Sequence, residues 1–118
     1  MGGRAGGGAR GGAGGAGLSA YDRDNLAMFK KLGHPRAEIA QLANDIRKDN
    51  AKNASTVSGI KLTKTGKGSY NLSWNDSSTS NGQGGSISFS ASPQKAAAAA
   101  KTLKMTGSGR KTLFTLNN

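Results

Sequence analysis

Apolar and polar side chains alternate through the middle of this chain, and that pattern constrains the fold more than any other feature. Apolar residues recur at every second position within residues 59–65, 69–75 and 86–91. This spacing, with Ser, Thr, Asn and Lys in between, predicts three short strands, each buried on one face only. The Gly-Lys-Gly sequence at residues 66–68 predicts a tight hairpin turn between the first two strands. We therefore expect a small, mostly antiparallel sheet, with the ring of Trp74 anchoring its core.

An alanine-rich helix is expected after the third strand. Ser92 supplies a hydroxyl that can cap a helix, and Pro93 suits the first helical position. Residues at helical spacing then form a narrow apolar stripe that can lie on the sheet, namely Ala96, Ala99, Ala100 and Leu103. The Gly-Ser-Gly sequence at residues 107–109 ends this helix. Residues 110–116 contain β-branched and aromatic side chains, so we expect a closing strand that pairs with an edge of the sheet.

Two further helices are expected before the sheet. Ser19 and Asp22 have the spacing of a short capping box, and Gly33 ends the helix that they begin. Pro35 opens a second helix with the most regular apolar stripe of the chain, Ile39, Leu42, Ala43 and Ile46. The polar residues 49–55 predict fraying at its end. A DNA-reading helix-turn-helix is the alternative, but the residues after the stripe offer no recognition helix, so a hairpin that supports the sheet is preferred.

The expected organisation is a single α+β domain over residues 18–118. It consists of an N-terminal helical hairpin over residues 18–53, followed over residues 57–118 by a sheet of three to four strands with one Ala-rich helix packed on it. Residues 1–17 are Gly and Ala apart from Met1 and two arginines. Glycine loses more conformational entropy on ordering than any other residue, so we expect a disordered arm. It is either a flexible leader or an arginine–glycine segment that contacts nucleic acid.

Positive charge is concentrated in the second half of the chain. The formal net charge is +11, from 17 basic and 6 acidic side chains. After residue 53 the only carboxylate is Asp76, which suggests that this half faces a polyanion or an acidic protein surface. The candidate binding residues are therefore the basic side chains of this half: Lys61, Lys64, Lys67, Lys95, Lys101, Lys104, Arg110 and Lys111.

The composition offers nothing typical of an enzyme. There is no cysteine, and His34 is the only histidine, so thiolate chemistry and the usual transition-metal sites lack ligands. The glycine-containing segments 64–68 and 107–111 lack the lysine–hydroxyl pair of a nucleotide-binding loop. We expect no catalytic residue, no metal and no cofactor. No apolar run approaches the roughly 20 residues that span a bilayer, and no secretory signal is recognisable, so we expect a cytoplasmic protein.

Two segments resemble known kinds of protein. The opening Met-Gly-Gly-Arg, followed by more glycines, resembles leaders on proteins of bacteriophages and mobile elements. The expected order of helix, three antiparallel strands and helix over about residues 36–106, with Lys95 in the first turn of the last helix, resembles the layout of double-stranded RNA-binding domains. That family presents a cluster of lysines where this chain has one. The resemblances imply a bacterial host cell and binding to RNA.

Charge and layout together favour a small, non-catalytic protein that binds nucleic acid, or a nucleic-acid–protein complex, through its lysines and arginines. The alternative is an anti-CRISPR-like inhibitor that docks on a host defence nuclease. A minor structural phage protein is a third interpretation. The sequence does not choose between these partners, and it predicts no oligomeric state.

Overall fold

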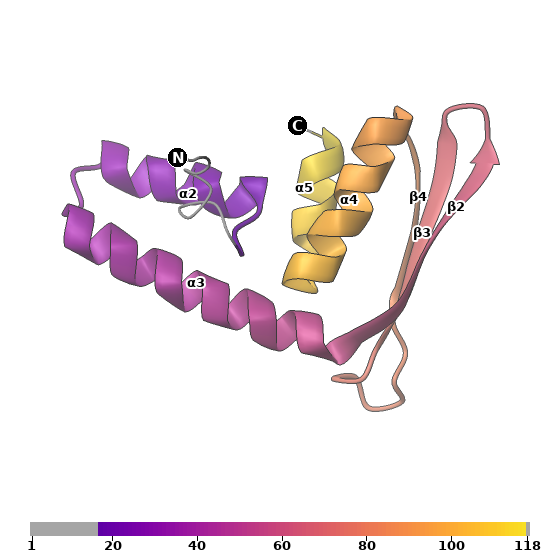
Figure 1. The fold of residues 1–118 in the computed structure, drawn as a ribbon, viewed down its shortest axis with the longest axis horizontal. Helices are drawn as coiled ribbons and strands as arrows, with labels where there is room; N and C mark the ends of the chain where they lie inside the picture. The colour runs from indigo at the N-terminus through magenta and orange to yellow at the C-terminus, as the bar shows by residue number, and fades with distance from the viewer. Residues whose placement is uncertain (1–16, 118) are drawn as a thin grey trace, which may run out of the picture.

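The computed structural model describes residues 17–117, so all but the last residue of the predicted arm lies outside the described part. The described residues form four helices and one three-stranded sheet, as expected for an α+β fold (Figure 1). In chain order the elements are α2 (Ala20–Lys31), α3 (Arg36–Thr56), β2 (Val57–Gly66), β3 (Ser69–Asp76), β4 (Gly85–Ser90), α4 (Pro93–Thr106) and α5 (Gly109–Asn117).

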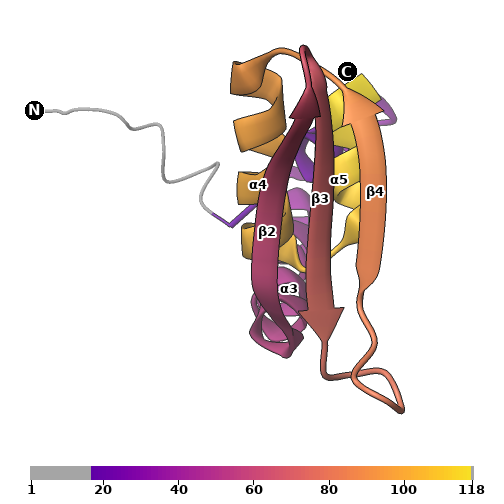
Figure 2. The same cartoon turned by 90° about the vertical axis from the view of Figure 1, so that its right-hand side faces the viewer.

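The sheet is antiparallel throughout, with strand order β2-β3-β4. Leu72 in the central strand lies opposite Leu62 on one side and Ile87 on the other, so the predicted period-two pattern places apolar side chains on one face. On that face the rings of Tyr70 and Phe89 are stacked, with 6.0 Å between their centroids. The helices cover this face only, and Figure 2 shows the opposite face with every helix behind it. We call the opposite face the open face.

The core lies between β3 and α4. Leu72, Ala96, Ala99 and Leu103 are fully buried, which confirms the predicted stripe on the alanine-rich helix except at the half-buried Ala100. The start of α4 also follows the sequence, because the Ser92 hydroxyl accepts a hydrogen bond from the backbone N–H at the third helical position. The end of α4 also follows the sequence, because the C-cap residue Gly107 has φ 64, a conformation that other residues rarely adopt.

Trp74 is only half-buried and does not lie at the centre of this core, contrary to expectation. Its ring lies against the backbone of Gly85 in β4, and a side chain at that glycine would clash with the ring. Gly109, at the start of α5, also lies close to the ring. Trp74 therefore packs where β3, β4 and the start of α5 meet. The large side chains at the centre of the core are Leu72 and Leu103, which are fully buried.

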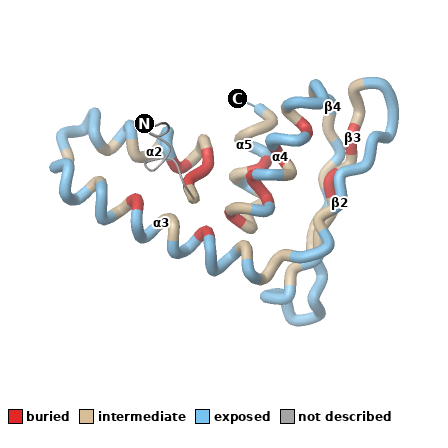
Figure 3. The backbone as a smooth tube through the Cα atoms, viewed as in Figure 1, coloured by how far each residue is buried: buried red, intermediate tan, exposed pale blue. Residues whose placement is uncertain are grey.

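Helices α2 and α3 extend away from the sheet (Figure 1). The predicted capping box is present, because the Ser19 hydroxyl and the Asp22 carboxylate each accept a hydrogen bond from the other residue's backbone N–H. The predicted fraying of residues 49–55 is wrong, since α3 continues to Thr56. Only its C-terminal part approaches α4 and β2. Helix α3 thus leads away from the sheet and does not lie on it. Most of α2 and α3 is exposed or half-buried (Figure 3).

Residues 110–116 form a helix, so the predicted closing strand is wrong. The Ser108 hydroxyl accepts a hydrogen bond from the Lys111 N–H at 3.3 Å, and this caps the start of α5. The Thr112 and Thr115 hydroxyls donate to backbone carbonyls four residues earlier, which satisfies both side chains inside the helix. The tertiary contacts favour this outcome, because the Phe114 ring packs edge-on against Tyr21 with 5.4 Å between centroids.

Candidate nucleic-acid interface

The fold separates the eight predicted binding residues into groups with different surroundings. Five of them, on β2, the hairpin turn and α4, are exposed and lie along one edge of the molecule. Arg110 is exposed on α5, which packs against α4 and α2. The other two, Lys95 and Lys111, are half-buried.

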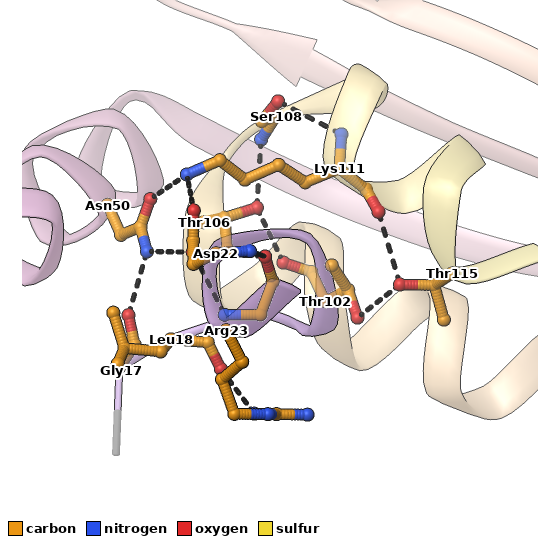
Figure 4. Close-up of polar contacts among 11 residues, drawn as sticks. Gly17, Leu18, Asp22, Arg23, Asn50, Thr102, Thr106, Ser108, Lys111 and Thr115 are labelled. Atoms are coloured by element: carbon orange, nitrogen blue, oxygen red, sulfur yellow. Dashed lines mark hydrogen bonds and ion pairs between the residues drawn. The ribbon is translucent and has the colours of Figure 1, made fainter. Parts of the chain in front are cut away.

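Lys111 belongs to an internal polar network and is withdrawn from any ligand. Its ammonium donates to Asp22 Oδ1 and to Asn50 Oδ1, each at 2.7 Å (Figure 4). The Asn50 amide in turn donates to Asp22 Oδ2 at 3.0 Å and to the Gly17 carbonyl at 2.7 Å. These contacts join α5, α2 and α3. Lys111 is therefore engaged in structural contacts, and we do not include it in the binding surface described below.

The carboxylate at the centre of this network is almost completely buried, with Asp22 only 2% exposed. Burial by itself raises the pKa of the Asp22 carboxyl. Hydrogen bonds from Lys111, the Ser19 backbone, Asn50 and the Ser19 hydroxyl outweigh burial and hold that pKa below its ordinary value. Asp22 is thus a charged, fully partnered group whose function is to hold the helices together.

Lys95 points away from the other two lysines of α4. Lys95 and Lys104 are nine residues apart, or about two and a half turns, so they lie on opposite sides of the helix. The neighbours of Lys95 on its own side of the helix are Thr102 and Thr106, both of which are buried. The three lysines of α4 therefore do not form a single stripe, although all three are candidate binding residues in the sequence.

Lys101 and Lys104 lie beside β2. Together with Ala100 they form one wall of an open groove of about 530 Å³, and residues 57–60 of β2 form the other wall. Because β2 is an edge strand, this groove runs along the outer boundary of the sheet. Both lysines are exposed at its rim.

The lysines of β2 reach the same edge from both faces of the sheet. Lys64 lies opposite the buried Tyr70, so it is on the helix-covered side, whereas Lys61 lies opposite Ser73 on the open face. Lys67 occupies the turn that ends β2. We call the set Lys61, Lys64, Lys67, Lys101 and Lys104 the basic edge.

The charge of the basic edge is not neutralised within residues 17–117. None of its five ammonium groups has an ion pair or a side-chain hydrogen bond there, in contrast to Lys111, which is paired with Asp22. Asp76, the only acidic residue of the sheet, accepts hydrogen bonds from the Ser78 backbone and hydroxyl. An array of exposed, unpaired lysines attracts anions over roughly a Debye length, about 8–10 Å in physiological salt.

Aromatic side chains are absent from the basic edge. The rings of the sheet, Tyr70, Trp74 and Phe89, belong to the helix-covered face. The open face carries hydroxyl and amide groups, among which Asn71 Nδ2 donates to the Ser86 and Ser88 hydroxyls at 3.0 and 3.1 Å. The sheet therefore has no exposed ring on which a nucleic-acid base could stack.

His34, the only histidine of the sequence, is held in structural contacts. His34 Nδ1 lies 3.0 Å from Glu38 Oε1, and its ring packs edge-on against Phe29. Within residues 17–117, no group of three or more His, Asp or Glu side chains is arranged to hold a metal ion. In the same part of the chain, no helix combines the length and the apolar character that crossing a membrane requires.

Sequence reasoning missed two features of this region. The first is the groove itself, which depends on α4 lying beside β2 and has no local signature. The second is Asn50, which is 1% exposed although its neighbours suggested a frayed helix end.

Comparison of the chain with protein-family models, with curated proteins and with solved structures finds no match to any of them.

Proposed function

We propose that this protein is a non-catalytic nucleic-acid-binding protein, and that the basic edge contacts the phosphate backbone of its ligand. The observation that carries the proposal is the arrangement of five exposed lysines along one edge, with no carboxylate partner among the described residues. Neutralising phosphates with lysines releases condensed counterions, which is the main source of affinity in binding that ignores sequence.

The spacing of the lysines suits a phosphate backbone. Lys61 and Lys67 are six residues apart along β2 and its turn, a distance of about 20 Å. Lys101 and Lys104 are separated by about 4.5 Å along the axis of α4. One strand of a duplex presents a phosphate about every 3.4 Å of helix axis, so an edge of this length, laid along the axis, spans about six base pairs and meets phosphates of both strands.

The lack of exposed rings favours a duplex ligand over a single strand. Proteins that bind single strands without sequence preference stack bases on aromatic side chains, and the basic edge offers none. Duplex recognition through phosphates and sugar hydroxyls needs only cations and polar groups, as on the open face. We therefore expect duplex DNA or RNA to bind at least as tightly as single strands, with little preference for sequence.

Salt titration tests the proposal. The affinity of the full chain for labelled duplex and single-stranded DNA and RNA is measured at several salt concentrations. Five phosphate contacts on a duplex predict that log K falls with log salt at a slope of about 4.5. The variant Lys101→Gln/Lys104→Gln should reduce the slope by about two units, because two contacts are lost.

A matched control separates this local effect from a change in overall charge. Lys30→Gln/Lys31→Gln removes the same charge from two exposed residues at the end of α2, outside the basic edge. This variant should retain most of the slope of the parent. Equal losses in the two variants, or no binding of any of the four ligands at low salt, would contradict the proposal.

A second candidate is an anti-defence inhibitor from a phage or mobile element, which docks on a host nuclease in the bacterial cytoplasm. Two large apolar side chains at the end of α2 favour a protein partner, since Met28 is 51% and Leu32 is 70% exposed. A pull-down from host lysate, with and without nuclease treatment, distinguishes the candidates. Partners lost after nuclease treatment support nucleic-acid binding, and a partner retained only when Met28 and Leu32 are intact supports the inhibitor.

A further inference from the structure

We propose that the groove between β2 and α4 binds an extended acidic peptide segment of a partner protein, which adds to the free edge of β2 as a fourth strand. This inference goes beyond nucleic-acid binding. It rests on the edge of β2, the floor of the groove and the charge at its rim.

The edge of β2 is available for pairing. The strand has ten residues and a single neighbour, β3, within the described chain. Its outward N–H and C=O groups therefore have no strand partner among the described residues, and residues 57–60 of this strand line the groove. An edge strand beside a helix forms the kind of cleft in which an extended peptide adds to a sheet, with main-chain hydrogen bonds supplying affinity and the helix supplying side-chain contacts.

The strand is irregular at the groove. The pairing with β3 shifts between Ser58 and Lys61, so β2 contains a bulge there, and Gly59 in the bulge has φ 61. A bulge leaves a residue without a partner on the neighbouring strand. Bulges and edge lysines discourage indiscriminate pairing between sheets, so an edge of this kind selects a ligand with matching charge.

The lining of the groove specifies the chemistry of the ligand. The apolar residues of the two walls, Val57, Ile60 and Ala100, form the floor between them, and Lys101 and Lys104 stand on the helix wall. No carboxylate lines the groove. In an extended segment alternate side chains point to opposite sides. In a segment added to β2, one set therefore lies over the apolar floor beside α4, and the other set lies on the open face, where Lys61 is exposed. A segment with apolar residues at every second position and Asp or Glu between them matches both surroundings, and Lys101 and Lys104 at the rim add to the attraction for its negative charge.

Substitutions of two alanines on α4 test the site. Ala100→Phe fills the groove and leaves every lysine in place. Ala97→Phe adds the same ring one turn earlier, at an exposed position that does not line the groove. The probe is a labelled hexapeptide of alternating Glu and Val, with a Lys-Val hexapeptide as charge control. We expect the parent and Ala97→Phe to bind the Glu-Val peptide, Ala100→Phe to bind at least tenfold more weakly, and none to bind Lys-Val.

A backbone-modified peptide tests the strand pairing on the unaltered protein. N-methylation of alternate residues removes main-chain donors from one edge of the Glu-Val peptide and preserves its charge. Peptides methylated on the even or the odd positions should differ in affinity by at least tenfold, because only one set of donors faces β2. Equal affinities of the two methylated peptides would overturn strand addition, as would equal loss in the two phenylalanine variants.

The test also separates this site from the proposed function. Ala100→Phe should leave the affinity for duplex unchanged, because the lysines of the basic edge remain. Duplex and Glu-Val peptide should compete, since both are attracted to lysines of the basic edge. If the parent binds no peptide and Ala100→Phe weakens duplex binding, the groove is a nucleic-acid channel and the peptide proposal fails while the proposed function stands.

Discussion

Lys111 Nζ in α5 lies 2.7 Å from Asp22 Oδ1 in α2, and the same ammonium also donates to Asn50 in α3. One side chain near the C-terminal end of the described chain thereby joins two helices that precede the sheet. The ion pair is largely shielded, since Asp22 is 2% exposed and the Lys111 side chain 18%. The network therefore fixes how α2 and α3 sit against α4 and α5.

Replacing Lys111 with methionine should destabilise the fold. The aliphatic part of the side chain is retained, but the buried Asp22 carboxylate loses its cation, and breaking a buried pair from one side costs about 3–5 kcal/mol. The free energy of unfolding from urea titration measures the loss. Lys104→Met, at an exposed lysine without a partner, should change stability by less than about 0.5 kcal/mol.

The double variant Asp22→Asn/Lys111→Met should be more stable than the sum of the two single losses predicts. Removing both charges leaves no unpaired ion in the interior, so the coupling energy should be about 1–3 kcal/mol. Additive losses would show that the ion pair does not couple α2 to α5.

Acid should weaken the fold through the same carboxyl. Because the pKa of Asp22 is lowered in the folded state, its charged form contributes stability at pH values above its ordinary 3.8. That contribution disappears as the pH falls through the lower pKa of the folded protein. Unfolding measured from about pH 5 to about pH 2 should show a smaller decline for Asp22→Asn than for the parent. Parallel curves would contradict this assignment.

Gly107 should be more sensitive to substitution than a glycine of similar backbone conformation elsewhere. Gly107 and Gly33 both have positive φ, 64 and 94, so alanine strains either position by about 1–2 kcal/mol. A Cβ atom at Gly107 also collides with the backbone of Asn53 in α3, whereas nothing lies within 4 Å of one at Gly33. We expect Gly107→Ala to lower the melting temperature clearly more than Gly33→Ala, and equal shifts would exclude the close approach of α4 to α3.

Leu103 should carry more stability than Leu113, although both are leucines on neighbouring helices. Leu103, on the side of α4 that faces the sheet, is 0% exposed, whereas Leu113 on α5 is 43% exposed. Truncation of a fully buried leucine to alanine leaves a cavity and costs about 2–5 kcal/mol. Leu113→Ala should cost less than about 1 kcal/mol. Chemical denaturation of both variants measures the difference, and similar losses would place the core elsewhere.

Much of the secondary structure could be predicted from the sequence because its signals are local. The alternation through Tyr70 and Leu72 gives the strands and their buried face. Hydroxyl groups at Ser19 and Ser92 mark two helix starts, since a cap acts on N–H groups two or three residues away. The Gly-Lys-Gly turn sets the first hairpin. Each of these interactions is complete within a few residues and needs no distant partner.

The conformation of residues 110–116 was decided by tertiary contacts. Threonine and phenylalanine favour strands, but this propensity amounts to only about 1 kcal/mol over the whole scale. In the helical conformation Phe114 packs against Tyr21 and Lys111 pairs with Asp22, and these contacts outweigh so small a preference. The only local signal for it is the Ser108 cap, which the flanking glycines obscured.

The candidate site likewise has one property that the sequence predicts and others that depend on tertiary contacts. The sequence by itself determined that the second half of the chain carries excess positive charge, because net charge depends on composition alone. The fold decided which lysines are available to a ligand. It paired Lys111 with Asp22, turned Lys95 away from Lys104, and set α4 against β2 to form the groove. A lysine's environment depends on residues distant in sequence, and local spacing carries no record of them.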